Sequence, residues 1–573
     1  ISVFAKSTVT GTFATSKSIN VTIASTSPAP GPTPSDPNPT PPPNPNAPGP
    51  GGTCSAGAVP TPSTRVALNR SGLFYGATNN GALKSGAQPA TVTFSGGCGS
   101  WSVSTTATWV DITTTSGSGP GTFTVSVKPG TYPAGTFLSS TLTVTAPGVA
   151  NSPITIPLQF RAYATTTDPF GAVDTPANNA TGIVGSIGVT GWALDDIAVS
   201  QVTIWRDPMP GETASSNGKV FIGNAVQVDG ARPDVDAAYS QPFDYQAGWG
   251  YLMLTNMLPN QGNGTFKLSM YADDVEGHRV LLGTRTITVD NANATKPFGA
   301  IDTPTQGGTV SGTDFVNFGW VLTPQPNTVP TDGSTIMVYI DGVPVGRPTY
   351  NQYRSDIATL FPGRNNSNGA VGFYHLDTTT LSNGVHTIAW GVTDNAGNAE
   401  GIGSRYFTVL NGAAVSAITV ERSSSTQSAM GQALQVRVAA TSGDAAGQPA
   451  STVAALPLTD APVYLRTGFD QTAPLEVIDR TAAGVSVVNV AELTRFQLTL
   501  GSPASGETDR YEGYVVANGR LEALPSGAFL DGQSGEFFWQ PGVGFMGTYE
   551  LVFVRISGET RERIPVEVRI TAR

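Results

Sequence analysis

Apolar and polar residues alternate in short runs along most of the chain. Runs such as ATVTFS, GTFTVSVKP and STLTVTA are separated by turns rich in Gly, Asn, Ser and Pro. Strict alternation over such short lengths predicts half-buried strands. Long amphipathic helical windows are absent from the sequence. The pattern therefore predicts an all-β chain.

Composition refines this prediction to many small domains. The 573 residues include 67 Gly and 44 Pro, and only 12% of them are charged. This length suggests about four domains, and the composition favours short strands joined by turns. We expect serial Ig-like β-sandwich domains joined by short linkers, with a Pro-rich spacer near the N-terminus.

The first residues, 1–25, have the pattern of a hairpin that closes an incomplete Ig-like domain. The same pattern closes two later segments, at 268–289 and 388–409, and there a full set of strands precedes it. Because an isolated two-stranded hairpin is marginal in water, we expect this one to be completed by a missing domain or by another chain. The apolar residues that would be buried in this way are Val3, Phe4, Ile19, Val21 and Ile23.

Shifts in composition set the expected domain boundaries. Residues 26–52 lack hydrophobic periodicity and are rich in Pro, which is typical of a semi-rigid spacer. The predicted order is the hairpin or donor strands at 1–25, the spacer at 26–52, a sandwich at 53–163, Ig-like repeats at 164–292 and 293–412, and a C-terminal sandwich region of one or two modules at 413–573.

The two central segments are an internal repeat. DPFGAVDTP corresponds to KPFGAIDTP, GWALDD to GWVLTP, and ARPDV to YRSDI. The residues that recur are Asp174 and Asp302, Trp192 and Trp320, and the pairs Arg232/Asp234 and Arg354/Asp356. We interpret the Asp residues as caps of their own turns, the Trp residues as core and the Arg–Asp pairs as clamps on a long loop.

Three parts of the chain resemble known bacterial modules. The run GSWSVSTTATWVDITTTSGSGPGTFTVSV resembles the BACON family, which is often attached to carbohydrate-active or surface proteins. That resemblance makes Trp101 and Trp109 candidate platforms for sugar stacking, although alternating Trp residues on a sandwich strand usually fill the core. The central repeats resemble Ig-like repeats of large secreted proteins in Gram-negative bacteria, and the C-terminal run GEFFWQPGVGFMGTYE resembles Ig modules of bacterial surface proteins. These resemblances imply an extracellular, bacterial cell-surface protein.

The only two cysteines, Cys54 and Cys98, fall in one expected domain. We expect them to form a disulfide, which would indicate an oxidising compartment. Two unpaired buried thiols are the alternative.

Charge and hydropathy exclude two kinds of partner. The net charge of −11 and the pI of about 4.8 have the wrong sign for phosphate backbones, so we expect no nucleic acid. No run of about 18 apolar residues is present, so we expect no membrane-spanning helix.

We expect no cofactor. Calcium is the alternative, because several acidic residues lie in turns. Asp195, Asp196, Asp273, Asp274 and Asp394 lie in plausible turns, and calcium often rigidifies junctions between tandem extracellular modules. No stretch has the D-x-D-x-[DN]-G spacing of a calcium loop.

Enzymatic chemistry has few candidate residues. The repeat alignment places His386 opposite Phe266, His375 opposite Met253 and His278 opposite Asn398, as expected for ordinary strand and loop positions. Motifs of zinc proteases, α/β-hydrolases, P-loops and dinucleotide-binding folds are all absent. We therefore predict that the chain is not an enzyme.

Two functional hypotheses follow from the sequence. In the first, the chain is a structural subunit of a surface fibre whose hairpin joins it to further copies, or to other surface proteins, by strand addition. In the second, it is an adhesin or polysaccharide-binding stalk in which exposed aromatic residues bind glycans.

Overall fold

The computed structural model describes residues 2–6, 13–18, 59–62, 64–95, 97–381, 383–411, 448–501 and 509–573. It consists of two compact units, 1–47 and 48–573. In the first unit, β1 (Ser2–Lys6) pairs antiparallel with β2 (Phe13–Ser18) in a two-stranded sheet. Within the described ranges, no helix is long and apolar enough to cross a membrane.

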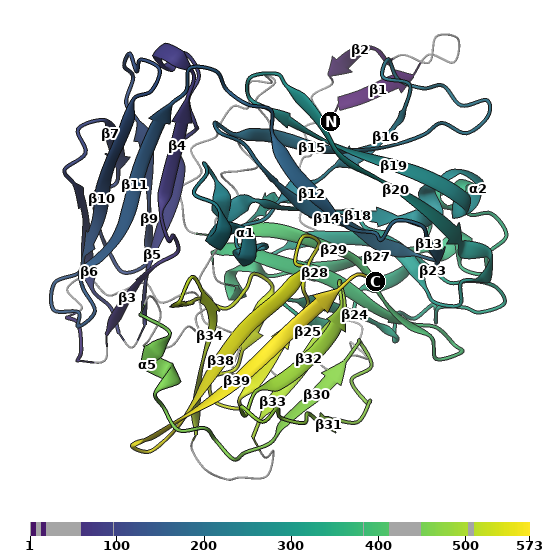
Figure 1. Ribbon diagram of the computed structural model, residues 1–573. Helices are drawn as coiled ribbons and strands as arrows, with labels where there is room; N and C mark the ends of the chain where they lie inside the picture. The colour runs from purple at the N-terminus through teal and green to yellow at the C-terminus, as the bar shows by residue number, and fades with distance from the viewer. Residues whose placement is uncertain are drawn as a thin grey trace, which may run out of the picture. The chain divides into compact units, whose positions relative to one another are not determined.

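The first sandwich covers residues 65–162 and has two facing sheets (Figure 1). One sheet has the order β4–β11–β10–β6–β8 and the other the order β3–β5–β9–β7. Burial alternates along β11, as its sequence ITIPLQFRA requires, and the inward side chains form one core. The strands are β3 (Arg65–Leu68), β4 (Leu73–Ala77), β5 (Gln88–Ser95), β6 (Ser100–Thr105), β7 (Val110–Thr113), β8 (Ser116–Ser118), β9 (Gly121–Val127), β10 (Phe137–Thr145) and β11 (Ile154–Ala162).

The second sandwich covers residues 170–290. Its sheets have the orders β12–β14–β18–β17 and β13–β20–β19–β15–β16 (Figure 1). The long hairpin β19–β20 forms the closing pair that the sequence pattern indicated. The strands are β12 (Phe170–Thr175), β13 (Ala180–Ile183), β14 (Ser186–Leu194), β15 (Val199–Arg206), β16 (Val220–Asn224), β17 (Val226–Gln227), β18 (Gly248–Leu254), β19 (Asn263–Asp274) and β20 (Arg279–Asp290).

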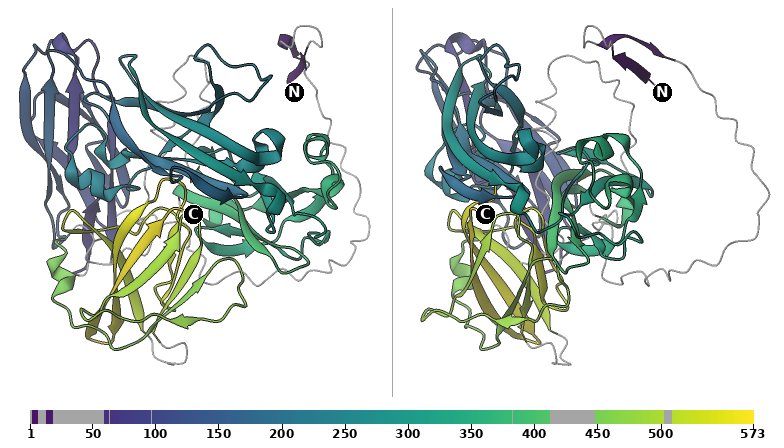
Figure 2. Two further views of the ribbon diagram at one scale, coloured as in Figure 1. Left: turned by 45° about the vertical axis from the view of Figure 1, so that its right-hand side comes forward. Right: turned by 90° about the vertical axis from the view of Figure 1, so that its right-hand side faces the viewer.

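The third sandwich, residues 298–409, repeats this topology strand for strand. Its sheets have the orders β21–β23–β27–β26 and β22–β29–β28–β24–β25, so the internal repeat is confirmed (Figure 2). The strands are β21 (Phe298–Ile301), β22 (Gly308–Val310), β23 (Phe315–Leu322), β24 (Ile336–Ile340), β25 (Val343–Gly346), β26 (Thr349–Gln352), β27 (Val371–Leu376), β28 (Gly384–Thr393) and β29 (Ala399–Val409).

The fourth sandwich covers residues 463–571. Two five-stranded sheets, β31–β30–β33–β37–β36 and β32–β39–β38–β34–β35, enclose one core that includes Phe496, Trp539 and Phe553. Residues 413–447 of the expected C-terminal sandwich region lie outside the described residues. The strands are β30 (Val463–Thr467), β31 (Glu476–Val477), β32 (Ser486–Ala491), β33 (Phe496–Leu500), β34 (Arg510–Ala517), β35 (Arg520–Glu522), β36 (Ala528–Leu530), β37 (Glu536–Trp539), β38 (Gly547–Ser557) and β39 (Thr560–Thr571).

Helical segments are short and lie in the loops. α1 and α3 occupy equivalent loops of the two repeats, and each follows the recurring arginine, Arg232 or Arg354. The α-helices are α1 (Pro233–Ala238), α2 (Pro259–Gly262), α3 (Ser355–Leu360) and α5 (Ser451–Ala454). The 3₁₀ turns are η1 (Asn79–Gly81), η2 (Asp244–Gln246), η3 (Thr255–Met257), η4 (Asn291–Asn293), η5 (Ser367–Gly369) and η6 (Thr378–Thr380). The predicted fold class, serial Ig-like β-sandwiches, is confirmed.

The sandwiches pack directly on one another. The core of the fourth sandwich is continuous with Val228 and Ala231 of the second and with Tyr406 of the third. Two glycines permit close backbone approach: a Cβ on Gly76 would lie 1.7 Å from the carbonyl oxygen of Asp196, and one on Gly250 would lie 2.5 Å from the amide nitrogen of Gly544. The four sandwiches therefore share closely packed junctions.

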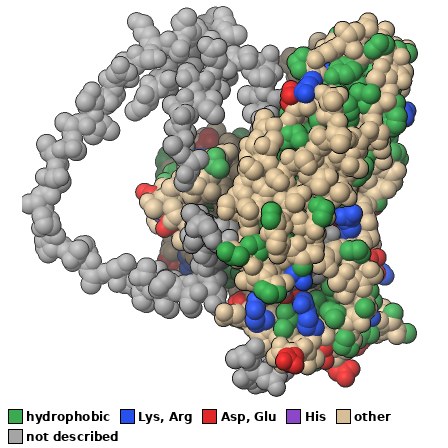
Figure 3. Space-filling model, turned by 90° about the vertical axis from the view of Figure 1, so that its left-hand side faces the viewer, with side chains coloured by type: hydrophobic (Ala, Val, Ile, Leu, Met, Phe, Trp, Pro, Cys, Tyr) green, Lys and Arg blue, Asp and Glu red, His purple; other side chains and the backbone are tan. Residues whose placement is uncertain are grey.

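Charged side chains on one surface of the molecule gather toward the lower end of the view in Figure 3 and are sparse above it. On the side that bears β6, β7 and β10, hydrophobic side chains are scattered among uncharged polar side chains and backbone atoms (Figure 3). Scattered apolar residues are normal on a soluble protein. Among the described residues in that view, they do not form a continuous apolar docking patch.

Candidate functional site

The recurring arginines form the same ion-pair triad in both repeats. The guanidinium of Arg232 donates to Asp174 at 2.6 Å and to Asp234 at 2.6 and 2.7 Å. Arg354 donates in the same way to Asp302 and Asp356. Asp174 and Asp302 thus differ from the expected turn caps, because each accepts from an arginine on a distant loop. The triads tie β12 and β21 to the short helices.

The recurring tryptophans lie on β14 and β23, the strands that pair with β12 and β21. Trp320 is buried and packs edge-on against Phe298. Trp192 is half-buried and packs edge-on against Phe170.

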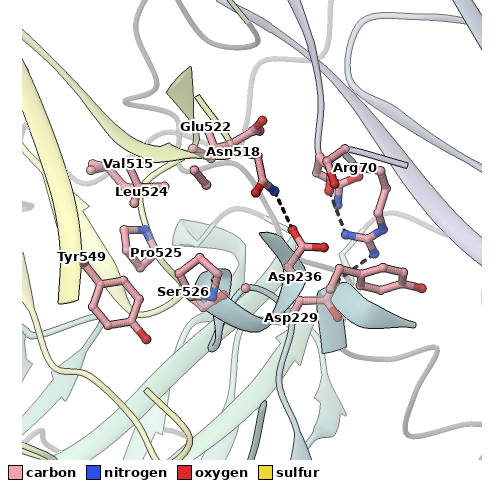
Figure 4. Close-up of a pocket in the computed structure, with 17 residues that line it drawn as sticks. Arg70, Asp229, Asp236, Val515, Asn518, Glu522, Leu524, Pro525, Ser526 and Tyr549 are labelled. Carbon is pink, nitrogen blue, oxygen red and sulfur yellow. Dashed lines mark hydrogen bonds and ion pairs between the residues drawn. The ribbon is translucent and has the colours of Figure 1, made fainter. Parts of the chain in front are cut away.

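A pocket lies where the first, second and fourth sandwiches meet (Figure 4). Its volume is about 120 Å³. On one side Figure 4 shows Arg70, Asp229 and Asp236, and on the other Leu524, Pro525, Ser526 and Tyr549. A cavity of this size has room for several water molecules.

Arg70 is the arginine in the lining of this pocket, and its guanidinium N–H groups donate hydrogen bonds to three residues. It donates to Asp229 at 2.9 Å and to the carbonyl oxygens of Pro89 and Asn69, and its guanidinium stacks 3.6 Å from the ring centroid of Tyr245. The side chains of Arg70 and Asp229 are 3% and 2% exposed. An ion pair this deeply buried costs stability when one partner is removed.

Further acids surround this single arginine. Asn518 donates to Asp236 at 3.0 Å from the fourth sandwich. Burial, reinforced by Asp236, raises the pKa of Asp244 to about 8, and burial raises the pKa of Glu522 to about 8. The lining residues include neither His nor Cys. The pocket therefore lies at a junction where burial raises the pKa values of nearby acids.

A second cluster of acids lies at the junction of the first and second sandwiches. Asp195, Asp196 and Glu276 each offer one carboxylate oxygen, and these oxygens lie within 4.8 Å of one another. Asp195 and Asp196 are 1% and 5% exposed. Burial raises the pKa of Asp195 to about 6 and also raises those of Asp196 and Glu276. We call these three residues the acidic cluster.

The sequence had named five aspartates as calcium candidates, and the structure separates them. Asp195 and Asp196 belong to the acidic cluster, and Asp274 lies next to it. Asp273 instead binds Arg279, with its Oδ2 2.7 Å from Nη2, and Asp394 lies in the third sandwich. Glu276 was missed although it stands two residues after Asp274, because only aspartates were considered as ligands. The repeat alignment could have revealed it, since its counterpart is Ala396.

The three histidines contact aspartates in unrelated places. Nδ1 of His278 lies 2.6 Å from Asp274, that of His375 2.5 Å from Asp314, and that of His386 2.6 Å from Asp341. His278 lies in the second sandwich, and His375 and His386 lie in the third.

The tryptophans named as glycan platforms face the interior of the first sandwich. Trp101 is 2% exposed, and its Nε1 donates to the carbonyl oxygen of Gly119. Trp109 is half-buried and packs 5.8 Å from the ring of Phe160. Neither presents a fully open ring face to a sugar.

Other candidate residues lie partly outside the described chain. Cys98 is disulfide-bonded, while Cys54 lies outside the described residues. Val3 and Phe4 lie in β1, and Ile19, Val21 and Ile23 lie outside the described residues.

Comparisons with known proteins add only distant likenesses. No protein-family model and no curated protein matches the chain. The fibronectin(III)-like modules of Clostridium thermocellum CbhA are 13% identical, cover 42% of this chain and 95% of their own, and give a TM-score of 0.14. The N-terminal four Ig domains of Dscam1 isoform 6.9 are 8% identical, cover 88% of this chain and 99% of their own, and give a TM-score of 0.21.

Enzymes also occur among the similar structures. A Bacteroides ovatus GH5 xyloglucanase is 19% identical over 22% of this chain and 27% of its own, with a TM-score of 0.15. Likenesses with TM-scores this low carry no information about function.

Proposed function

We propose that this chain is a non-enzymatic extracellular structural protein of a bacterial surface, a fibre subunit that joins its neighbours by strand addition. Serial Ig-like sandwiches are typical of extracellular structural or adhesion proteins. The residues that line the pocket include neither His nor Cys, which supports a non-enzymatic role.

The observation that carries the proposal is the separate sheet of β1 and β2. Among the described strands these two pair only with each other, whereas each of the four sandwiches has two sheets of four or five strands. A two-stranded sheet is marginal in water and leaves both outer edges open. Addition of these strands to a sheet of a further domain would satisfy those edges.

The packing of the sandwiches supports a stiff subunit. Buried contacts join the second and fourth sandwiches, where the hydroxyl of Tyr549 donates to the carbonyl oxygen of Ala231 at 2.5 Å. The third and fourth are joined where Arg495 donates to the carbonyl oxygen of Gly342 at 2.6 Å. A head-to-tail contact between such blocks generates an open fibre when its rotation does not close into a ring.

The test compares the intact chain with a variant that lacks residues 1–25. We expect fibres of the intact chain by electron microscopy and monomers of the variant by analytical ultracentrifugation. A synthetic peptide of residues 1–25 should shorten the fibres by occupying the acceptor sheet. If both proteins are monomeric and the peptide binds neither, the fibre proposal is wrong.

An adhesin is the second candidate, and one surface feature favours it. Phe221 on β16 is 46% exposed, and its ring centroid lies 5.0 Å from that of the half-buried Trp205 on β15. Exposed aromatic rings can stack on sugars. Affinity electrophoresis in polysaccharide gels should then show retardation that Phe221→Ala removes, with Phe137→Ala, another exposed ring, as the control.

A further inference from the structure

We propose that the acidic cluster of Asp195, Asp196 and Glu276 binds a calcium ion at the junction of the first and second sandwiches. Three oxygens within 4.8 Å of one another all lie within about 2.8 Å of a common point, so a small adjustment brings them to the calcium–oxygen distance of about 2.3–2.6 Å. This inference is independent of how the chain assembles.

Each of the three carboxylates uses one oxygen for the fold and leaves the other without a hydrogen-bond partner. Oδ2 of Asp195 accepts from the amides of Ile197 and Ala198 at 2.8 Å. Oδ2 of Asp196 accepts from the amide and hydroxyl of Thr167, and Oε1 of Glu276 accepts from the hydroxyl of Thr166.

The remaining oxygens, Oδ1 of Asp195, Oδ1 of Asp196 and Oε2 of Glu276, are buried and accept no hydrogen bond. Buried polar atoms in proteins are almost always satisfied. A bound cation therefore explains why three neighbouring carboxylates each keep one buried oxygen without a hydrogen bond.

Neighbouring side chains do not neutralise this charge. Among the described residues, neither Lys nor Arg lies within 4.0 Å of the three carboxylates, whereas the equally buried Asp229 has Arg70. The nearby imidazole of His278 is bound to Asp274, 2.6 Å away. A divalent cation would supply the charge that the chain lacks there.

The third sandwich shows that the fold does not need these acids. At its equivalent positions Thr323, Pro324 and Ala396 replace Asp195, Asp196 and Glu276. The one acid kept there, Asp394, accepts from the hydroxyl of Thr323 at 2.9 Å and from the amide of Asn398 at 2.9 Å. The same loops are thus built without a cluster, so the extra carboxylates of the second sandwich point to a ligand.

The donor set favours calcium over zinc. The adjacent group of Asp274, Glu276 and His278 includes an imidazole. However, Oδ1 of Asp274 already accepts from the amides of Glu276, Gly277 and His278, at 2.7–2.8 Å. The atoms that remain free to bind a metal ion are all carboxylate oxygens, which hard cations prefer as ligands. Water would complete the coordination.

The location gives the ion a structural role. The loop that carries Asp195 and Asp196 packs on the first sandwich, where the hydroxyl of Ser85 donates to the carbonyl oxygen of Ile197 at 2.7 Å. Thr166 and Thr167 belong to the linker between the two sandwiches and bind the cluster directly. Calcium would therefore lock this linker to the second sandwich.

The test uses the intact chain, stripped with a chelator, and adds calcium alone. Isothermal titration should show one site, and terbium should bind in its place with luminescence sensitised through Tyr163, whose pKa is raised by burial and by the nearby Asp196 and Asp195. Calcium should also slow proteolysis at residues 163–168. In Asp195→Asn/Glu276→Gln, which keeps the oxygens that accept hydrogen bonds, calcium affinity should fall at least about tenfold.

Asp394→Asn, at the equivalent place in the third sandwich, is the matched control and should leave calcium affinity unchanged. Circular dichroism of each variant checks that it folds. If the intact chain binds no calcium at millimolar concentration, or if the double variant binds as tightly as the intact chain, the proposal is wrong. Preferential binding of zinc at these residues would also overturn it.

Discussion

Arg70 of the first sandwich lies 2.9 Å from Asp229 of the second, although 159 residues separate them in the sequence. Both side chains are almost fully buried. Arg70→Met should therefore destabilise the chain by about 3–5 kcal/mol, because it leaves Asp229 buried without its guanidinium partner. Denaturant unfolding followed by Trp fluorescence measures this loss.

Arg569→Ala is the control for that prediction. Arg569 binds Glu567 in an exposed pair, in which its own side chain is 52% exposed. Exposed pairs contribute at most about 1 kcal/mol. Equal losses in the two variants would contradict the importance of the buried pair.

Close backbone contact at Gly76 makes a separate prediction about the same junction. A Cβ there would lie 1.7 Å from the carbonyl oxygen of Asp196, so Gly76→Ala should force the two sandwiches apart. We expect faster proteolysis at residues 163–168 and a lower melting temperature. Gly86→Ala, whose Cβ would come no closer than 3.7 Å to Phe243, should behave as the unchanged chain. Unchanged proteolysis of Gly76→Ala would show that the junction adjusts without cost.

The two arginine triads provide a prediction with a built-in comparison. The side chain of Arg232 is 11% exposed and that of Arg354 is 34% exposed. Since charge pairs weaken with solvent exposure, Arg232→Ala should lower the free energy of unfolding more than Arg354→Ala. The order of the two melting temperatures checks this, and the reverse order would refute it.

Burial of Glu492 predicts a pH dependence of stability. Glu492 is 2% exposed, and burial raises its pKa from 4.5 to about 7, opposed by the amide and guanidinium of Arg573, the hydroxyl of Thr175 and the amide of Gly188. The folded state therefore binds this proton more tightly than the unfolded state. The resulting stabilisation is fully present below pH 4.5 and is lost as the pH rises through 7, a change of about 3 kcal/mol.

Glu492→Gln should remove this contribution and flatten the melting temperature between pH 4.5 and 8. Asp195, Asp244 and Glu522 have raised pKa values and add slopes of the same sign, so part of the dependence should remain. Glu476→Gln, at an exposed position, serves as the control and should keep the full slope. An unchanged slope in Glu492→Gln would contradict the assignment.

Local patterns predicted the fold well because strands and turns are encoded locally. The alternation of residues in β11 and the repeated hairpin of β19 and β20 could be recognised directly, and so could the duplication of the second sandwich in the third. The contact of Asp174 with Arg232 joins two of the recurring residues, yet it was not predicted. Spacing in the sequence does not show which turns meet in space.

The junctions were the least predictable part of the molecule. Arg70, Asp229 and Tyr245 carry no local motif, because their roles arise only from the packing of separate sandwiches. Asp195 and Asp196 were recognised as acids in a turn, but their partner Glu276 comes from the far end of β19. Alignment of the two repeats could have revealed Glu276, because the acid stands where the other repeat has a neutral residue.

A parallel strand pair near the ends of each sandwich has a mechanical consequence. The last strand of each sandwich pairs in parallel with an earlier one: β11 with β4, β20 with β13, β29 with β22 and β39 with β32. Tension that pulls the two members of such a pair in opposite directions loads their hydrogen bonds in shear, all together, whereas an antiparallel hairpin pulled from its open end unzips one bond at a time. We therefore expect each sandwich to resist unfolding by a stretching force.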